Sequence, residues 1–304
     1  MSFNSLPFLL HNSDQHINDF LTFLKVERRY SRHTLIAYHR DISQFSFFLE
    51  NQYGMDFLLV KHLHIRSYIV ELMNQKLSNR SVCRKLSALK SFYKFFLKHQ
   101  LIAVSPLANV QLPKIEKRLP SFVKEKEILT LNDRSAFDDD FFGLRDYILL
   151  RLLYQTGMRL SELIGLKTVD IAKESIKVTG KRNKQRIIPI SKGFFEIISE
   201  YIVLKNKEFG ASNLSFIVAD SGDKVYEKFV YRKVNYYIGK VSSLEKKSPH
   251  VLRHTFATHM LNNGADLNAI KEILGHENLS ATQVYTHNSF EKLKNIHQQA
   301  HPRG

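Results

Sequence analysis

The sequence predicts a mainly α-helical protein of two domains, with a small β-sheet in the second. Its 304 residues fall in the range where one hydrophobic core usually gives way to two. Apolar residues recur three and four positions apart through most of the first hundred residues, which is the spacing of amphipathic helices. Residues 175–191 instead alternate around a polar turn, so we expect a β-hairpin there.

Four helices are expected in the first domain, residues 1–104. Ile17, Phe20, Leu21 and Leu24 illustrate the pattern, because they share one helical face. The segments with this pattern are 17–30, 34–54, 64–74 and 79–99. The domain boundary is expected in residues 105–122, SPLANVQLPKIEKRLPSF, which contain three prolines and no sustained period.

Helices and one hairpin are expected in the second domain, residues 123–304. DYILLRLLYQTG and MRLSELIGL predict helices, and SIKVTG and QRIIPIS predict strands joined by the polar turn KRNK. Two further helices, 193–210 and 231–241, flank a short expected strand, LSFIVA. After Pro249 we expect three short helical segments, ending with ATQVYTH and the tail FEKLKNIHQQAHPRG.

The charge balance is that of a protein that binds a polyanion. Lys and Arg number 45 against 29 Asp and Glu, giving a net charge of +16 and a pI near 9.7. Nucleic acid is the first candidate partner and an anionic membrane surface the second. No apolar run approaches the roughly 20 residues of a spanning helix, and the N-terminus lacks the features of a signal peptide. We therefore expect a cytoplasmic protein.

The fourth expected helix carries six cations and no acid between them. Single charged residues usually lie on solvated faces, but this collection favours a helix that faces phosphates. The six residues are Arg80, Arg84, Lys85, Lys90, Lys94 and Lys98.

No metal or cofactor is expected. His250 and His254 have a spacing that can bind zinc, but the glutamate of an HExxH site is missing and Arg253 would repel a cation. The acidic run FDDDFF fits helix capping better than a two-metal site. TGKRNK lacks the first glycine of a phosphate-binding loop, so ATP is not implied. Cys83 is the single cysteine, so an internal disulfide is excluded. We expect Cys83 to be a buried residue of a helix.

Cations also gather at expected helix starts in the second domain. His250 and Arg253 open one such helix, whose positive dipole end attracts anions. Each residue of this kind also has an ordinary structural interpretation, as an ion pair, a solvated turn, a cap or a half-buried phenol. The other candidates are Arg159 at a helix start, Lys181 in the hairpin turn, His276 after Leu-Gly, and Tyr285 nine residues later.

Five short motifs in the second domain resemble, in their order and spacing, those of a known protein family. TGMRLSELIGL, VTGKRNKQRIIPI, HVLRHTFATHML, ILGH and TQVYTH resemble, in this order, the tyrosine recombinase family of site-specific DNA recombinases, and its Xer type in particular. SRHTLIAYHRDISQFSFFL is similar to the family's core-binding domain, so the resemblance covers nearly the whole chain. It implies a helical, SAM-like core-binding domain and a mixed α/β catalytic domain that form a C-shaped clamp on DNA.

The resemblance also implies site residues. Arg159, Lys181, His250, Arg253 and His276 match the family's catalytic set, and Tyr285 matches its nucleophile. His254, Phe256 and His259 are expected to be structural. Arg182 stands where Xer-like sequences usually have Gly, and it adds charge to the hairpin turn. The expected DNA contacts, which include this turn, are Arg80, Arg84, Lys85, Lys90, Arg182 and Lys184.

The implied partner is double-stranded DNA carrying a dif-like site, with a homo- or hetero-tetramer of recombinases and no membrane. The resemblance further implies a sister Xer protein contacted through the C-terminal helix, where Phe290, Leu293 and Ile296 form one stripe, and a septal DNA translocase as activator. Resolution of chromosome dimers is the expected role. The alternatives are an integrase or invertase of a mobile element, a type IB topoisomerase, and a DNA-binding protein without catalysis.

Overall fold

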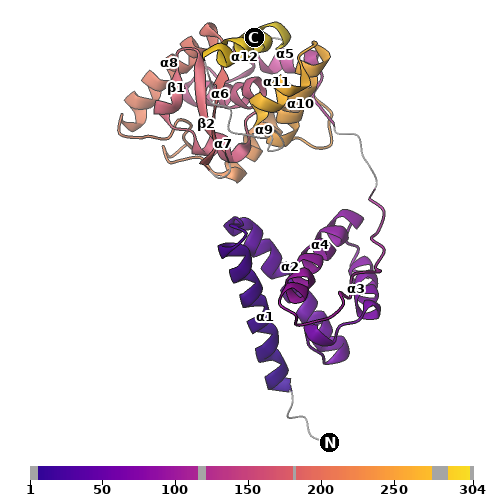
Figure 1. The fold of residues 1–304 in the computed structure, drawn as a ribbon. Coiled ribbons are helices and arrows are strands. Elements are labelled where there is room, and N and C mark those ends of the chain that lie inside the picture. Colours follow the sequence, from indigo (N-terminus) through magenta and orange to yellow (C-terminus); the bar gives the residue numbers. More distant parts are fainter. Residues whose placement is uncertain (1–5, 116–120, 181–182, 276–286, 302–304) are drawn as a thin grey trace, which may run out of the picture. The chain divides into compact units, whose positions relative to one another are not determined.

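The structure is a computed structural model that describes residues 6–115, 121–180, 183–275 and 287–301. The chain divides into two compact units, Met1–Arg118 and Leu119–Gly304, and the division falls inside the proline-containing segment 105–122. The expected fold class is confirmed: helices dominate both units, and the second also holds one small sheet (Figure 1).

The first unit is a helical bundle with an aromatic core. Its elements are α1 (Leu6–Val26), α2 (Arg32–Tyr53), the 3₁₀ helix η1 (Phe57–Leu59), α3 (His62–Asn74) and α4 (Asn79–Lys98). Phe20, Phe45 and Phe92 are fully buried. α1 begins well before the expected residue 17, because Pro7 is tolerated in the first turn of a helix, where its missing N–H would have no partner.

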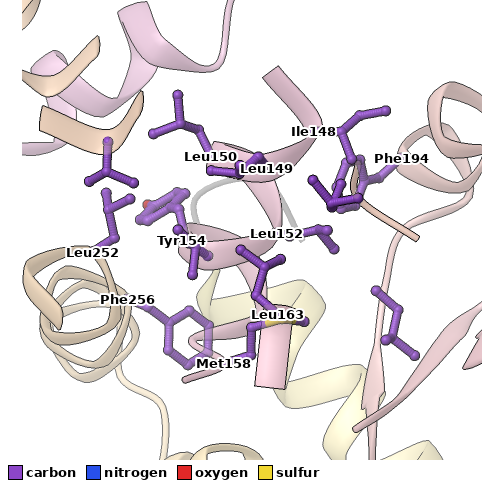
Figure 2. Close-up of a cluster of buried hydrophobic side chains, with 14 of the residues drawn as sticks. Ile148, Leu149, Leu150, Leu152, Tyr154, Met158, Leu163, Phe194, Leu252 and Phe256 are labelled. Atoms are coloured by element: carbon purple, nitrogen blue, oxygen red, sulfur yellow. The ribbon is translucent and has the colours of Figure 1, made fainter. Parts of the chain in front are cut away.

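The second unit surrounds a buried central helix. Its helices are α5 (Glu125–Leu131), η2 (Arg134–Ala136), α6 (Phe141–Thr156), α7 (Leu160–Gly165), η3 (Thr168–Asp170), α8 (Lys192–Phe209), α9 (Glu227–Val241), α10 (Pro249–Asn262), α11 (Leu267–Leu274) and α12 (His287–Ala300). Every residue of α6 from Gly143 to Thr156 is buried, and its charged residues Arg145 and Asp146 pair with each other at 2.8 Å. Figure 2 shows its side chains meeting Phe194, Leu252 and Phe256 from neighbouring elements.

Both ends of α6 are set by local chemistry. Asp140 is the N-cap and accepts a hydrogen bond from the backbone N–H of Gly143 at 2.6 Å, so the expected capping role of the FDDDFF run is confirmed. Gly157 ends the helix in the left-handed region, with φ of 57°. A Cβ at Gly157 would lie 2.6 Å from Cδ1 of Phe256 and 2.7 Å from Cδ2 of Leu274, so the turn that leads to Arg159 requires glycine.

The sheet is antiparallel and has the order β1 (Ile171–Ala172), β2 (Ser175–Thr179) and β3 (Gln185–Pro189). The expected hairpin is confirmed, with Ile176 paired to Ile188 and Val178 to Arg186. The expected strand LSFIVA is wrong, since only isolated bridges form at Ser215 and Val218. Side chains of α8 use the backbone carbonyls there instead: Lys205 Nζ donates to the Ser215 carbonyl at 2.8 Å, and Tyr201 Oη donates to that of Phe216 at 3.1 Å.

Candidate active site

Three arginine side chains converge on the C-terminal end of α11. Three successive carbonyls of this helix end each accept one guanidinium N–H. Arg186 Nε donates to Ile273 at 2.7 Å, Arg253 Nη2 to Leu274 at 2.8 Å, and Arg159 Nη2 to Gly275 at 3.0 Å. The last carbonyls of a helix lack partners within it and carry partial negative charge, so this end of α11 is suited to hold cations.

One carboxylate, Glu162, lies within this group of arginines. It accepts hydrogen bonds from the backbone N–H and from Nη1 of Arg159, at 2.7 and 2.9 Å, and from both terminal nitrogens of Arg186. Burial by itself raises the pKa of the Glu162 carboxyl, but the hydrogen bonds and charge of Arg186, together with Arg159, bring that pKa below its ordinary value. Glu162 is therefore ionised at neutral pH.

The arginines differ in exposure. Arg186 and Arg253 are buried, whereas 34% of the Arg159 side chain is exposed. Burial and the neighbouring charge of Arg159 lower the pKa of Arg253 to about 10, which still leaves Arg253 protonated at neutral pH. Among the described residues, Glu162 is the only carboxylate that bonds to any of these three guanidinium groups, and it bonds to two of them. The excess positive charge, open to solvent at Arg159, can bind an anion such as a phosphate.

The first turn of α10 presents His250 and Arg253 to different environments. Ser248 is the N-cap and Pro249 the first residue of the helix, a combination that starts α10 at this point. His250 is exposed, while Arg253 turns inward and also donates from Nη1 to the Gly157 carbonyl at 2.6 Å. The start of α10 and the end of α6 are thereby joined through one side chain.

The residues of α10 that were expected to be structural lie deeper in the helix. Phe256 and His259 are buried, and His259 Nδ1 lies 3.0 Å from the hydroxyl of Tyr154, which confirms that expectation for both. His254 is half-buried, and burial together with His250 lowers the pKa of its imidazole.

Four of the expected site residues, Lys181, Arg182, His276 and Tyr285, lie outside the described residues, as does most of the segment ATQVYTH. The described chain reaches Gly180 and Gly275, which directly precede Lys181 and His276 in the sequence. Lys184 is exposed and directly precedes β3, the second hairpin strand.

The cations of α4 do not share one environment. Arg80 and Lys90 are exposed. Lys85 is buried, and its ammonium pairs with Asp41 of α2 at 3.0 Å, so the expectation that Lys85 faces DNA is corrected. Arg84 is half-exposed and pairs with the same carboxylate. Cys83 is buried as expected, and its thiol donates to the Pro113 carbonyl at 3.3 Å.

In the described part of the chain, no group of three or more His, Cys, Asp or Glu side chains is placed to hold a metal ion. The described helices also include none that is long and apolar enough to cross a membrane.

Sequence reasoning missed two parts of the molecule. The first is the pair Glu162 and Arg186; Arg186 shares the inward-facing side of β3 with the apolar Ile188, which is an available but weak signal. The second is the exposed face of α9, where cations alternate with aromatic rings. Tyr231 and Tyr236 are 44% and 57% exposed, and Lys240 Nζ lies 4.4 Å from the ring centre of Tyr236. Such a face suits nucleic acid.

Comparison with known proteins identifies the family. Residues 121–292 match the model of the phage integrase family, and residues 17–100 match the phage integrase N-terminal SAM-like domain. The chain is 38% identical to the tyrosine recombinase XerC of Chlorobaculum parvum, covering 94% of each chain, and 38% identical to that of Bacillus subtilis, covering 97% and 98%. The chain therefore belongs to the phage integrase family, whose members are tyrosine recombinases.

Solved structures share the fold. The site-specific recombinase XerH bound to its difH substrate, in a pre-cleavage complex, matches with a TM-score of 0.68 at 20% identity, over 93% of this chain and 84% of that one. A tetramer of lambda integrase bound to a Holliday junction matches with a TM-score of 0.64 at 17% identity, over 94% and 78%. At these identities the likeness concerns the fold alone.

Proposed function

We propose that this chain cleaves and rejoins DNA strands at a specific site, with the arginine cluster at the end of α11 holding the scissile phosphate. The observation that carries the proposal is the excess of guanidinium groups over carboxylates around Glu162 in the described part of the chain, with Arg159 open to solvent. Planar guanidinium groups bind two phosphate oxygens at once, which makes them suited to this task.

In the proposed reaction, Tyr285 attacks the phosphodiester. The phenol proton passes to His250, because a phenol with a pKa near 10 is a poor nucleophile at neutral pH. A bond forms between the tyrosine oxygen and phosphorus, and the bond from phosphorus to the 5′-oxygen breaks. Lys181 gives a proton to that leaving oxygen. The products are a 3′-phosphotyrosyl link and a free 5′-hydroxyl.

Arg159 and Arg253 stabilise the charge that gathers on the nonbridging oxygens of the pentacoordinate phosphorus, and His276 donates a further hydrogen bond. The energy of the broken bond is kept in the phosphotyrosine. A 5′-hydroxyl from a second duplex can therefore reverse the step and exchange strands. These steps use only side chains of the protein.

DNA binding is assigned to both units. In the first unit, the exposed cations of α4, Arg80 and Lys90, contact the phosphates. In the second, Lys184 of the hairpin and the exposed face of α9 do so. Both units contact the duplex, as the family resemblance implies. Binding that depends on so many cations weakens steeply with salt.

The biological role follows from the resemblance to Xer recombinases. The chain acts in the cytoplasm on a dif-like site, as part of a tetramer with itself or a sister recombinase, and a septal DNA translocase activates it. The expected outcome is resolution of chromosome dimers. An integrase or invertase of a mobile element would use the same chemistry, and activity on a dif-like duplex distinguishes the two roles.

Assembly through the C-terminal helix requires a rearrangement of α12. In this structure α12 packs against its own domain, where Lys294 Nζ pairs with Glu174 at 2.8 Å and His297 Nε2 lies 2.8 Å from the Gln155 carbonyl. Ile296 packs against the domain core. Docking of α12 on a neighbouring recombinase would exchange these contacts for equivalent ones on that neighbour.

Covalent trapping tests the proposed reaction. Purified protein is incubated in EDTA with a nicked suicide duplex that carries a dif-like site, and the products are resolved on a denaturing gel. We expect a protein–DNA adduct through the 3′-phosphate, absent from Tyr285→Phe and present in the matched control Tyr53→Phe, whose phenol lies on α2 in the first unit. Salt-sensitive DNA binding without any adduct would support a DNA-binding protein without catalysis.

A further inference from the structure

Arg186 of β3 forms an ion pair with Glu162 of α7. Glu162 also bonds to Arg159, the N-cap residue of α7, so the ion pair connects β3 to Arg159. Arg186 is 6% exposed, and its Nη1 and Nη2 donate to the two carboxylate oxygens of Glu162 at 2.9 and 2.8 Å. The same two oxygens accept hydrogen bonds from Arg159. Arg186 therefore acts on Arg159 through a single shared carboxylate.

The pair also contacts the residue before Lys181. A Cβ at Gly180 would lie 3.2 Å from Oε1 of Glu162 and 3.8 Å from Nη1 of Arg186. The Gly180 backbone thus passes directly beside the ion pair. Its N–H donates to the Lys184 carbonyl at 2.8 Å, which fixes the point where the hairpin turn begins.

A third contact reaches the residue before His276. Gly275 has a φ of 65°, and a Cβ there would lie 3.2 Å from both Cδ and Nη1 of Arg186. Arg186 Nε also donates to the Ile273 carbonyl at 2.7 Å. The side chain of Arg186 is thus in contact with the last turn of α11, immediately before His276 in the sequence.

We propose that Arg186 is a positioning residue for the active site. It holds Glu162 and the end of α11 so that Arg159 and the segments leading to Lys181 and His276 keep a fixed relative placement; the assignment rests on the proposed function, because it concerns the same site. Arg186 does not contact the phosphate, since 7% of its side chain is exposed and all three of its nitrogens donate within the protein. A lysine cannot replace its bidentate geometry.

The test compares Arg186→Lys and Arg186→Met with the wild-type full-length chain. Single-turnover cleavage of the suicide duplex is expected to slow by roughly 10- to 100-fold, because small misplacements of reacting groups cost rates of this order. The DNA dissociation constant is expected to stay at the wild-type value. In an Arg159→Ala background, the Arg186 substitutions are expected to add little further loss, since both act through the same group.

The matched control is Arg145→Lys. Arg145 is also buried and also paired with a carboxylate, Asp146, at 2.8 Å, but it contacts none of the groups at the end of α11 that hold Arg159. It is expected to lose thermal stability as Arg186→Lys does, yet to keep the wild-type cleavage rate. Equal slowing in Arg145→Lys, or additive losses with Arg159→Ala, would show that Arg186 only stabilises the fold and would overturn the proposal.

A second readout does not depend on cleavage. In protein labelled with ¹⁵N-arginine, the Arg159 side-chain signal, assigned through Arg159→Lys, is expected to show increased mobility in Arg186→Met and not in Arg145→Lys. An unchanged Arg159 signal in Arg186→Met would contradict the positioning role. A wild-type protein that forms no adduct overturns the proposed function separately, while the Arg159 signal still decides the role of Arg186.

Discussion

Two groups of charged side chains in the second unit, each built on a buried ion pair between an arginine and a carboxylate, illustrate how burial can serve either stability or binding. Around Arg145, two cations meet two carboxylates: Arg145 pairs with Asp146 and Asp220, and Lys233 also pairs with Asp146. Around Glu162, the described residues place three guanidinium groups near one carboxylate, which pairs with Arg159 and Arg186 and acts on Arg253 through its charge. The first group is electrically balanced, and its arginine is fully buried. The second carries excess positive charge among the described residues and opens to solvent at a cation, Arg159, whereas the first opens to solvent at an anion, Asp220.

The two groups differ in what accepts hydrogen bonds from the guanidinium groups: carboxylates around Arg145, and mainly backbone carbonyls at the end of α11. At the end of α11, carbonyl dipoles of Ile273, Leu274 and Gly275 hold the guanidinium groups without cancelling their charge. Arginines held in this way remain positive and fixed in direction, so the phosphate that we propose binds there would meet donors that need no reorganisation. The charge of Arg145 is instead offset by two carboxylates, Asp146 and Asp220, so this guanidinium group attracts an anion less.

The largest expected effect is on stability at the balanced group. Arg145→Met leaves the buried carboxylate of Asp146 with fewer partners, and loss of one member of a buried pair typically costs about 3–5 kcal/mol. Urea unfolding of the full chain measures this loss. The cleavage rate of the protein that remains folded should match the wild type; a rate loss larger than the unfolded fraction would remove the distinction between the two groups.

At the unbalanced group, the main effect is expected on rate. Arg159→Lys keeps the charge but loses the bidentate geometry, and removal of one such donor typically costs about 2.7–4 kcal/mol, or roughly 10²–10³ in rate. Single-turnover cleavage measures it. Because Arg159 is partly exposed, the unfolding midpoint should change little. A large stability loss with normal cleavage would reverse the assignments of the two groups.

A third group extends the comparison to pH. It consists of three buried histidines: His259 of α10, His297 of α12 and His301 directly after α12. Burial lowers the pKa values of His259, His297 and His301 below the ordinary value near 6.5, and the last two rings stack with centroids 5.0 Å apart. Between the folded and unfolded pKa values the unfolded chain binds more protons, so stability is full above pH 6.5 and falls as the pH drops. Each unit by which folding lowers a histidine pKa corresponds to about 1.4 kcal/mol of folding stability, which is lost once the pH falls below the pKa of the folded state.

Urea midpoints between pH 7.5 and pH 5 measure this dependence. His301→Phe, which keeps a ring against Tyr154 and Phe256, is expected to flatten the curve. An identical slope in the variant would show that other groups cause the acid sensitivity.

The smallest effect is expected on α4. Lys90→Ala removes an exposed cation, so the logarithm of DNA affinity should depend less on the logarithm of salt concentration, by about 0.9 for one lost phosphate contact. Lys85→Met removes a cation already paired with Asp41 and should leave that slope unchanged. Binding titrations at several salt concentrations measure both. If the salt dependence of DNA affinity changed in Lys85→Met but not in Lys90→Ala, the structural distinction between Lys85 and Lys90 would be contradicted.

The fold was largely predictable because local patterns decided it. Helices such as α4 follow the recurrence of Val82, Leu86 and Leu89, and the hairpin follows strict alternation around its turn. The segment LSFIVA failed because Lys205 and Tyr201, close to it in space but not part of its pattern, use its backbone carbonyls. Such interactions have no signature in the segment itself.

The site was predictable only in part, for a related reason. Arg159, His250 and Arg253 could be named because they belong to motifs at helix starts. Glu162 and Arg186 could not be paired from the sequence, because 24 residues separate them and only the tertiary fold joins them. Nor could the six cations of α4 be separated into exposed and neutralised ones, since Asp41 lies on another helix.

The most direct test of the central claim removes one negative charge from the phosphate that the arginine cluster is proposed to bind. A suicide duplex with a methylphosphonate at the scissile position lacks one nonbridging negative charge. If Arg159 serves to offset that charge, Arg159→Ala should be strongly defective on the phosphate duplex and recover most of the wild-type cleavage rate on the methylphosphonate duplex. An equal defect on both duplexes would show that Arg159 does not act on the phosphate charge, and would contradict the account.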